Sequence, residues 1–218
     1  IIPSVNGSGP PGVDRGKLVM VYEYLAPDGQ QVAIKGRFEG PNGKSFLWRL
    51  PELEAWGGLH GLRMTDLPLY GAPAVARADP RSVIYFVEGE KAQQACAAHG
   101  LLAVCQGGGA AARELGGLEL LRGRPVRLWP DNDPPGYGLM SRVAVALRGI
   151  AASVETVNVP LPEKADAFDY FLAGGAADGI TVEPSAAGAG TEFLAEDCVR
   201  VRILGDLGLV QLTFASLN

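Results

Sequence analysis

The chain has 218 residues, 47% hydrophobic and 20% charged, a size and apolar content that suit one α/β domain with a smaller appendage. Its net charge of −5 excludes an overall basic field that would attract nucleic acid, although six Lys and Arg residues stand among the first fifty positions. The three cysteines and two histidines show no zinc-ligand spacing, and no apolar stretch is long enough to span a bilayer.

The first eighty residues alternate short apolar segments with turn signals. Residues 1–14, rich in Gly and Pro, are typical of a flexible linker. Segments 18–25, 32–38 and 45–50 are separated by Asp-Gly and Asn-Gly turns, which predict an antiparallel meander. We therefore expect a small, β-rich and partly basic subdomain over 15–80, in which 51–80 forms a connector.

From about residue 81 the pattern changes to alternating strands and helices. Strands are expected at 83–87, 101–105, 126–129 and 154–159, and helices at 90–98, from the glycines 107–109 to 115, from 134 to about 148, and at 166–172. This order predicts an α/β domain over 81–175 with a mainly parallel sheet flanked by helices. Residues 176–191 are expected to be loose within a C-terminal extension, 176–218, which has possible strands at 199–203 and 210–214.

Two of these apolar runs stop abruptly at acidic residues. The first ends at Glu88, and the third ends at Asp131 and Asp133. Carboxyl ends of parallel strands are where open α/β sheets bind ligands, and the two aspartates would lie roughly 6–7 Å apart on one side of an extended segment. Acids this close repel one another unless a cation lies between them. The pattern therefore predicts a Mg²⁺ site.

The order of four motifs resembles the TOPRIM domain, specifically the DnaG-type primases and the primase-helicases of phages and plasmids. The motifs are Glu88-Gly89-Glu90-Lys91, Gly107-Gly108-Gly109, Leu128-Trp129-Pro130-Asp131-Asn132-Asp133-Pro134-Pro135-Gly136 and Lys164-Ala165-Asp166-Ala167-Phe168-Asp169-Tyr170-Phe171. The resemblance covers about 81–175 and implies a TOPRIM-like sheet preceded by the β-rich subdomain.

The resemblance also implies roles for individual acids. Glu88 is expected to act as the acid–base or metal-binding glutamate, Asp131 and Asp133 as the metal-ligand pair, and Asp166 or Asp169 as a further acid. Primases often place an aspartate four residues after the motif glutamate, where this chain has Ala92, and Glu90 is a candidate to compensate as a metal ligand. From the residues alone, Asp131 and Asp133 could instead form a turn, and Asp166 and Asp169 a helix cap.

Basic residues and glycines complete the predicted site. Lys91 could reach a phosphate or nucleotide, and so could Arg113 and the backbone amides of Gly107, Gly108 and Gly109, although solvated side chains and a tight turn explain them equally well. In the meander, Lys35, Arg37 and Arg49 alternate with Phe38, Phe46 and Trp48. Such a face would bind single-stranded nucleic acid, yet any half-buried strand shows the same alternation.

Together these features favour a DNA primase module that makes short RNA primers by metal-dependent nucleotidyl transfer with Mg²⁺ or Mn²⁺. The expected partners are single-stranded DNA and ribonucleoside triphosphates, with a replicative helicase in the same or another polypeptide. We expect a cytoplasmic protein, bacterial or encoded by a phage or plasmid, without membrane contact. A TOPRIM nuclease, a non-catalytic nucleic-acid-binding or assembly module and, less well matched, a haloacid-dehalogenase-like phosphatase remain alternatives.

Overall fold

The computed structural model describes residues 16–185. The predicted linker over 1–14 and the possible strands at 199–203 and 210–214 lie outside the described residues. None of the helices within 16–185 is long and apolar enough to cross a membrane.

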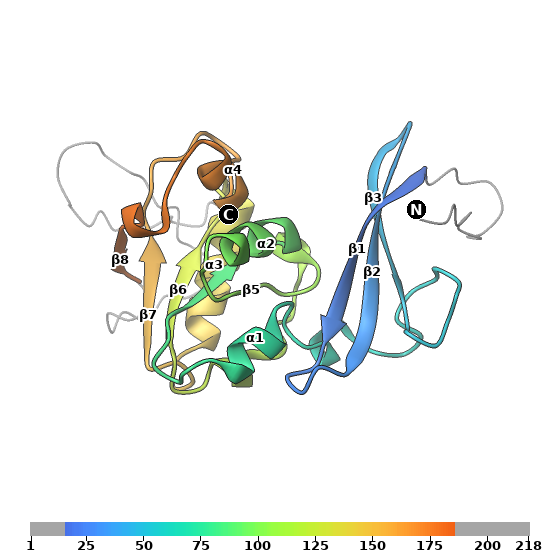
Figure 1. The fold of residues 1–218 in the computed structure, drawn as a ribbon, viewed down its shortest axis with the longest axis horizontal. Coiled ribbons are helices and arrows are strands. Elements are labelled where there is room, and N and C mark those ends of the chain that lie inside the picture. The colour runs from blue at the N-terminus through green and yellow to red at the C-terminus, as the bar shows by residue number, and fades with distance from the viewer. Residues whose placement is uncertain (1–15, 186–218) are drawn as a thin grey trace, which may run out of the picture. The chain divides into compact units, whose positions relative to one another are not determined.

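The N-terminal part is the predicted antiparallel meander (Figure 1). Its three strands, β1 (Lys17–Leu25), β2 (Gln31–Gly40) and β3 (Gly43–Arg49), pair in the order β1-β2-β3. Lys35 stands at the centre of β2, opposite Tyr22 on β1 and Trp48 on β3. Because β2 is covered on both sides by neighbours, its central residues are the most buried of the sheet.

A connector leads from the meander to the second sheet. It contains a short 3₁₀ turn, η1 (Met64–Asp66), and one helix, α1 (Ala72–Arg77). Tyr70 forms an isolated antiparallel bridge with Cys105, and its ring packs against Tyr22 and Tyr24 of the meander. Through Tyr70 the connector therefore contacts both sheets.

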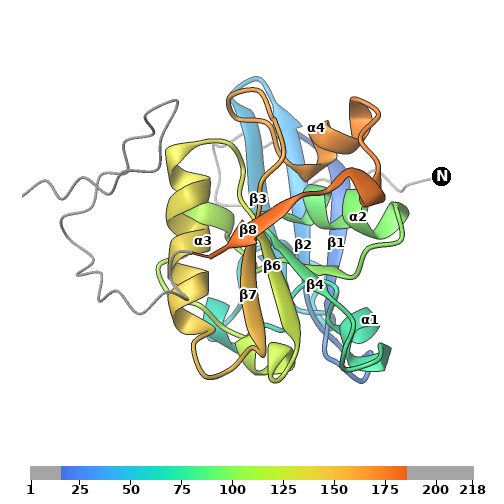
Figure 2. The same ribbon diagram turned by 90° about the vertical axis from the view of Figure 1, so that its left-hand side faces the viewer.

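The second sheet has the predicted mainly parallel architecture. The strands β4 (Ile84–Val87), β5 (Ala103–Val104), β6 (Pro125–Trp129), β7 (Ser153–Val157) and β8 (Val182–Pro184) lie in the order β5-β4-β6-β7-β8. All neighbours are parallel except β7 and β8. Figure 2 shows α3 (Pro134–Ala146) on one face of this sheet, and α2 (Glu90–Ala98) with α4 (Ala167–Leu172) on the other.

Each face of the sheet buries its own hydrophobic core, because successive strand residues point to opposite sides. Ile84 and Phe86 of β4 pack in the core that contains Leu139 and Val143 of α3. Tyr85 and Val87 belong to the core that contains Cys96 of α2 and Phe171 of α4. β4 is buried on both faces, and this explains why its sequence is continuously apolar. The prediction of a parallel strand here is confirmed.

The structure corrects the prediction of a helix from the triple glycine to residue 115. Only the 3₁₀ turn η2 (Gly109–Ala111) forms there, and Gly108 and Gly109 take the left-handed φ values of 102° and 54°. The Glu88 carboxylate accepts from the Ala110 N–H, and the Arg142 guanidinium donates to the carbonyls of Ala110 and Ala112. Side chains from elsewhere thus occupy the backbone groups that a helix would pair internally.

The structure also corrects the expectation that 176–191 is loose. Within its described part, Ala177–Gly179 forms a 3₁₀ turn, and Val182–Pro184 pairs with β7 as the antiparallel edge strand β8. A three-residue strand carries too little periodicity to stand out in an Ala/Gly-rich sequence, and its pairing with β7 depends on tertiary contact. The sheet therefore continues to residue 184.

Candidate functional site

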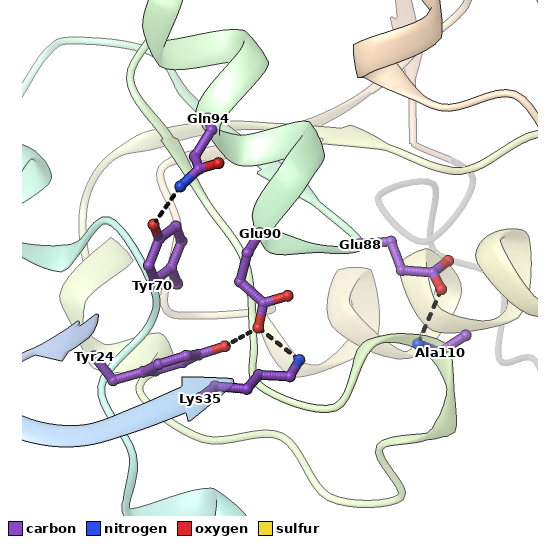
Figure 3. A network of polar contacts seen from close by, with 7 residues as sticks. All are labelled: Tyr24, Lys35, Tyr70, Glu88, Glu90, Gln94 and Ala110. Atoms are coloured by element: carbon purple, nitrogen blue, oxygen red, sulfur yellow. Dashed lines mark hydrogen bonds and ion pairs between the residues drawn. The ribbon is translucent and has the colours of Figure 1, made fainter. Parts of the chain in front are cut away.

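Glu88 follows the last residue of β4, at the carboxyl edge of the parallel sheet. Its Oε1 accepts from the Ala110 N–H at 3.2 Å, as Figure 3 shows, while its Oε2 is buried and has no hydrogen-bond partner among residues 16–185. Burial raises the pKa of this carboxyl most, and the nearby charges of Asp133 and Asp166 raise it further. Glu88 therefore carries an unused acceptor atom inside an acidic environment.

Asp131 and Asp133 follow β6, the strand that pairs with β4. Asp133 is the N-cap of α3, and its Oδ1 accepts from the Gly136 N–H at 2.8 Å. A Cβ on Gly136 would lie 2.6 Å from the Asp131 carbonyl oxygen, so only glycine lets the first turn of α3 approach the strand end this closely. The turn-and-cap alternative is therefore confirmed for Asp133, whose Oδ1 caps α3.

Asp131 has the most perturbed carboxyl of the region. Burial raises its pKa to about 8, and the charges of Glu88, Asp166, Asp133 and Asp169, in that order, act in the same direction. Four acids, Glu88, Asp133, Asp166 and Asp169, therefore lie within electrostatic reach of Asp131. The predicted convergence of Glu88, Asp131, Asp133, Asp166 and Asp169 at one sheet edge is what the structure shows; their functional roles stay predictions.

Asp166 and Asp169 form a capping box at the start of α4. The Asp166 Oδ1 accepts from the Asp169 N–H at 3.0 Å, and the Asp169 Oδ2 accepts from the Asp166 N–H at 3.1 Å. Burial is the main cause that raises the pKa of Asp166, and Lys91 acts against it. Within residues 16–185, no three Asp, Glu, His or Cys side chains are arranged so that they could hold a metal ion among themselves.

Glu90, two residues beyond Glu88, points toward the meander instead (Figure 3). Its Oε1 accepts from the Lys35 ammonium at 2.7 Å and from the Tyr24 hydroxyl at 2.5 Å, and all three side chains are buried. Burial above all raises the pKa of Tyr24, so that its hydroxyl keeps the proton it donates. The structure brings Lys35 and Glu90 together as an ion pair between β2 and α2.

Two aromatic rings lie close to the ammonium of this ion pair. The Lys35 ammonium is 4.6 Å from the ring centre of Phe46 and 5.5 Å from that of Trp48. Cationic and aromatic side chains therefore lie together as predicted, but Lys35, the central cation, pairs with Glu90 of α2. The sequence could not reveal this, because a half-buried strand and a strand covered by a second layer show the same alternation.

The other predicted cations lie in different places. Arg49 donates to the Leu53 carbonyl and covers Trp56, Arg37 pairs with Glu39, and Arg113 is exposed. Lys91 is exposed with its ammonium 3.5 Å above the Phe168 ring centre. Arg37 and Lys91 line one groove of about 750 Å³ between β1–β2 and α2–α4. Of the triple glycine, Gly107 is buried, Gly108 is exposed and Gly109 lies beside Glu88.

Two residues near the acids were missed by the sequence analysis. Asn132, between the two aspartates, donates from its side-chain amide to the carbonyls of Leu161 and Pro162. Lys44, next to the Asn-Gly turn, lowers the pKa of Glu88 by its charge. The position of Asn132 inside the acidic motif was a usable signal, whereas nothing in the sequence connects Lys44 with Glu88.

No protein-family model matches this sequence, and no curated protein matches it. Among solved structures, a DNA primase domain from Pseudomonas aeruginosa matches with a TM-score of 0.57 and 21% identity, over 78% of this chain and 53% of that one. The E. coli primase catalytic core matches with a TM-score of 0.52 and 19% identity, over 71% and 48%. A DnaG primase catalytic domain bound to single-stranded DNA matches with a TM-score of 0.50 and 17% identity, over 71% and 48%.

These matches define the fold of the chain. Its parallel sheet flanked by helices, with a separate three-stranded antiparallel sheet, is the fold of a primase catalytic core. The chain spans about half the length of the primase structures it matches. At identities near 20% the likeness concerns the fold, and the chemistry of this chain is argued from its own residues.

Proposed function

We propose that the chain is the catalytic part of a DNA primase, which makes short RNA primers on single-stranded DNA by divalent-metal-dependent nucleotidyl transfer of the TOPRIM type. The observation that carries this proposal is the cluster of five acids at the carboxyl edge of β4 and β6, within the fold of a primase catalytic core. The motifs around these acids resemble the phage and plasmid branch. A replicative helicase, in the same or another polypeptide, is the partner that this branch implies.

The donor set fits Mg²⁺ or Mn²⁺. Mg²⁺ is usually held by one or two carboxylates together with waters and substrate phosphates, so three converging carboxylates are not required. Glu88 offers a buried oxygen without a partner among residues 16–185, and burial, together with the acids around it, raises the pKa of Asp131 to about 8. A cation beside these groups would favour their charged forms. Asp131, Asp133 and Glu88 are therefore the residues that would hold it.

A bound divalent cation would neutralise phosphate charge and stabilise the attacking and leaving oxygens of the transfer. The chain itself supplies an acceptor for the proton of the attacking hydroxyl. Glu88, whose Oε2 is buried without a hydrogen-bond partner among residues 16–185, is the carboxylate that we assign as this acceptor. Lys91 and the backbone amides around the triple glycine would contact nucleotide phosphates.

The groove lined by Arg37 and Lys91 is the part of the described chain that we assign to the single-stranded template. Half-exposed Phe46 of the meander provides a ring on which a base can stack. The match to a DnaG primase catalytic domain bound to single-stranded DNA supports single-stranded DNA as a ligand, and the choice of this groove is our proposal.

The test is primer synthesis on single-stranded DNA with labelled ribonucleotides and Mg²⁺ or Mn²⁺, for the wild-type chain beside Asp131→Ala. Synthesis by the wild type that disappears in the variant, while circular dichroism shows a folded variant, is the expected result. Loss of labelled DNA without primer would indicate the nuclease alternative. Metal-independent DNA binding with neither reaction would indicate a binding or assembly module and overturn the catalytic proposal.

A further inference from the structure

Asn132 holds the segment that carries Asp166 against the Asp131–Asp133 turn through four hydrogen bonds. Its side-chain Nδ2 donates to the Leu161 carbonyl at 2.7 Å and to the Pro162 carbonyl at 3.0 Å. Its backbone N–H donates to the Ala165 carbonyl, and its own carbonyl accepts from the Lys164 N–H, both at 2.9 Å. These four hydrogen bonds join Asn132 to every residue of the segment 161–165 except its central Glu163.

The orientation of the Asn132 amide is fixed by its partners. Backbone carbonyls only accept, so the amide nitrogen must face Leu161 and Pro162. The Tyr137 hydroxyl, from the first turn of α3, donates to the Asn132 Oδ1 at 2.6 Å and thereby occupies the remaining side of the amide. Every polar group of this side chain therefore has a partner with matching chemistry.

The clamped segment has an unusual backbone. Lys164 takes a left-handed φ of 64°, which a residue with a side chain rarely adopts, and its N–H is the group that the Asn132 carbonyl accepts. The turn is closed by the Ala165 N–H, which donates to the Pro162 carbonyl at 3.1 Å. A strained turn persists where surrounding contacts hold it, and Asn132 supplies those contacts.

We propose that Asn132 is a positioning residue: it clamps residues 161–165 so that Asp166, the next residue, faces the acids that follow β4 and β6. The inference deepens the proposed function, because it concerns the arrangement of the same acidic site. Asp131 and Asp133 flank Asn132 directly, so the hydrogen bond from Asn132 to Ala165 brings the acids of the two segments side by side. The charge of Asp166 is among those that raise the pKa of Asp131, which agrees with this arrangement.

The experiment compares Asn132→Ala with Asn158→Ala in the 218-residue chain. Asn158 begins the same connection between β7 and α4, and its exposed side chain has only a 3.4 Å contact with Glu183, so it is a matched control for the same change. The first measurement is amide hydrogen exchange at Lys164 and at Leu128, which lies in the core strand β6. The second is Mn²⁺ affinity, followed by electron paramagnetic resonance.

The expected result is local. In Asn132→Ala, exchange at Lys164 becomes about tenfold faster or more, since two side-chain hydrogen bonds to its turn are lost, while exchange at Leu128 stays unchanged. Mn²⁺ binding weakens by about 10–100-fold, the usual effect of removing a residue that orients metal ligands. Asn158→Ala changes neither quantity. Tyr137→Phe, which removes only the hydroxyl that orients the amide, gives a smaller shift in the same direction.

Three results would overturn the inference: continued protection of Lys164 in Asn132→Ala, equal acceleration at Leu128, or an equal loss of Mn²⁺ affinity in Asn158→Ala. If the wild-type chain binds no Mn²⁺, the proposed metal chemistry fails, but hydrogen exchange still decides whether Asn132 clamps the segment. If Asn132→Ala does not fold, Tyr137→Phe provides the same pair of measurements, and unchanged exchange at Lys164 in that variant would contradict the clamp.

Discussion

Glu88 and Glu90 are two residues apart in the chain and have opposite electrostatic environments. Glu90 is buried with a cation and a hydroxyl, which together use its Oε1. Glu88 is surrounded by further acids, and its Oε2 is buried without a partner. A buried carboxylate that is paired with a cation and a hydroxyl inside the protein is compatible with a stable fold, whereas a buried carboxylate among other acids is stabilised by a cation bound from solution. The comparison gives Glu90 a structural role and supports the proposed ligand-binding role of Glu88.

The largest effect is expected for Glu88→Gln. The amide keeps an acceptor for the Ala110 N–H and nearly the same volume, so the fold should remain. Primer synthesis should fall by about 10²–10⁴-fold, the usual contribution of a general acid or base, with a smaller loss of Mn²⁺ affinity. Initial rates of nucleotide incorporation and a Mn²⁺ titration measure the two quantities.

Glu90→Gln is the comparison for this variant, because it makes the same chemical change at the paired glutamate. It should lower stability more than it lowers the rate measured with folded protein. Equal losses of rate in the two variants, at equal fractions of folded protein, would remove the distinction between the two glutamates.

Lys35→Met tests the structural role of Glu90, because Lys35 is its cationic partner. Removal of the cation leaves the Glu90 carboxylate buried and uncompensated, and this should destabilise the chain by about 3–5 kcal/mol. The double variant Lys35→Met/Glu90→Gln should recover much of that loss, because the charge is gone and the Tyr24 hydroxyl can still donate to the amide oxygen. Urea unfolding followed by circular dichroism measures all three proteins.

Lys44→Met is the control, since Lys44 is an exposed lysine of the same sheet and its replacement should change stability by less than about 0.5 kcal/mol. A loss in Lys35→Met no larger than that in Lys44→Met would show that the ion pair does not hold β2 and α2 together.

Asp131→Asn should stabilise the metal-free protein at alkaline pH. The pKa of Asp131 is raised to about 8 in the folded chain, so between about pH 4 and pH 8 the folded state holds a proton that the unfolded state has released. Wild-type stability should therefore fall as the pH rises through this window. At pH 8.5 the variant should gain about 2 kcal/mol, or about 4–8 °C in Tm, a figure reduced for solvent screening.

Thermal unfolding in EDTA at pH 4.5, 6.5 and 8.5 measures this difference, with Asp178→Asn, an exposed acid, as the control. The gain should be small at pH 4.5 and should shrink at pH 8.5 when Mg²⁺ is added, because the cation then stabilises the wild type alone. A gain that is independent of pH would mean that repulsion among the acids is not its cause.

The sequence predicted correctly those elements whose hydrophobic pattern matches the burial that the folded protein imposes on them. β4 is apolar throughout because both of its faces are covered, and α2 ends at Ala98 as predicted. The acids after β4 and β6 converge because parallel strands end at one edge, which topology alone requires. The pairing of Lys35 with Glu90 could not be predicted in the same way, because it joins strand β2 to helix α2 across 55 residues of the chain. The segment after Gly109 was misjudged for a related reason, since alanine content predicts a helix but Glu88 and Arg142 bind its backbone.

The smallest expected effect concerns the template groove. Arg37 lines this groove and is paired with Glu39 at a partly exposed site, so its replacement by Gln should leave stability within about 0.5 kcal/mol. If Arg37 contacts one phosphate of single-stranded DNA, Arg37→Gln should reduce the slope of log affinity against log salt by about 0.7 and weaken binding equally for all sequences. Fluorescence anisotropy with a labelled oligonucleotide at several salt concentrations measures the slope.

Arg122→Gln, which removes an exposed arginine paired with Glu119, is the control and should leave the salt slope unchanged. If both variants lower the slope equally, DNA is held by diffuse charge, and the assignment of the groove as the template site is wrong.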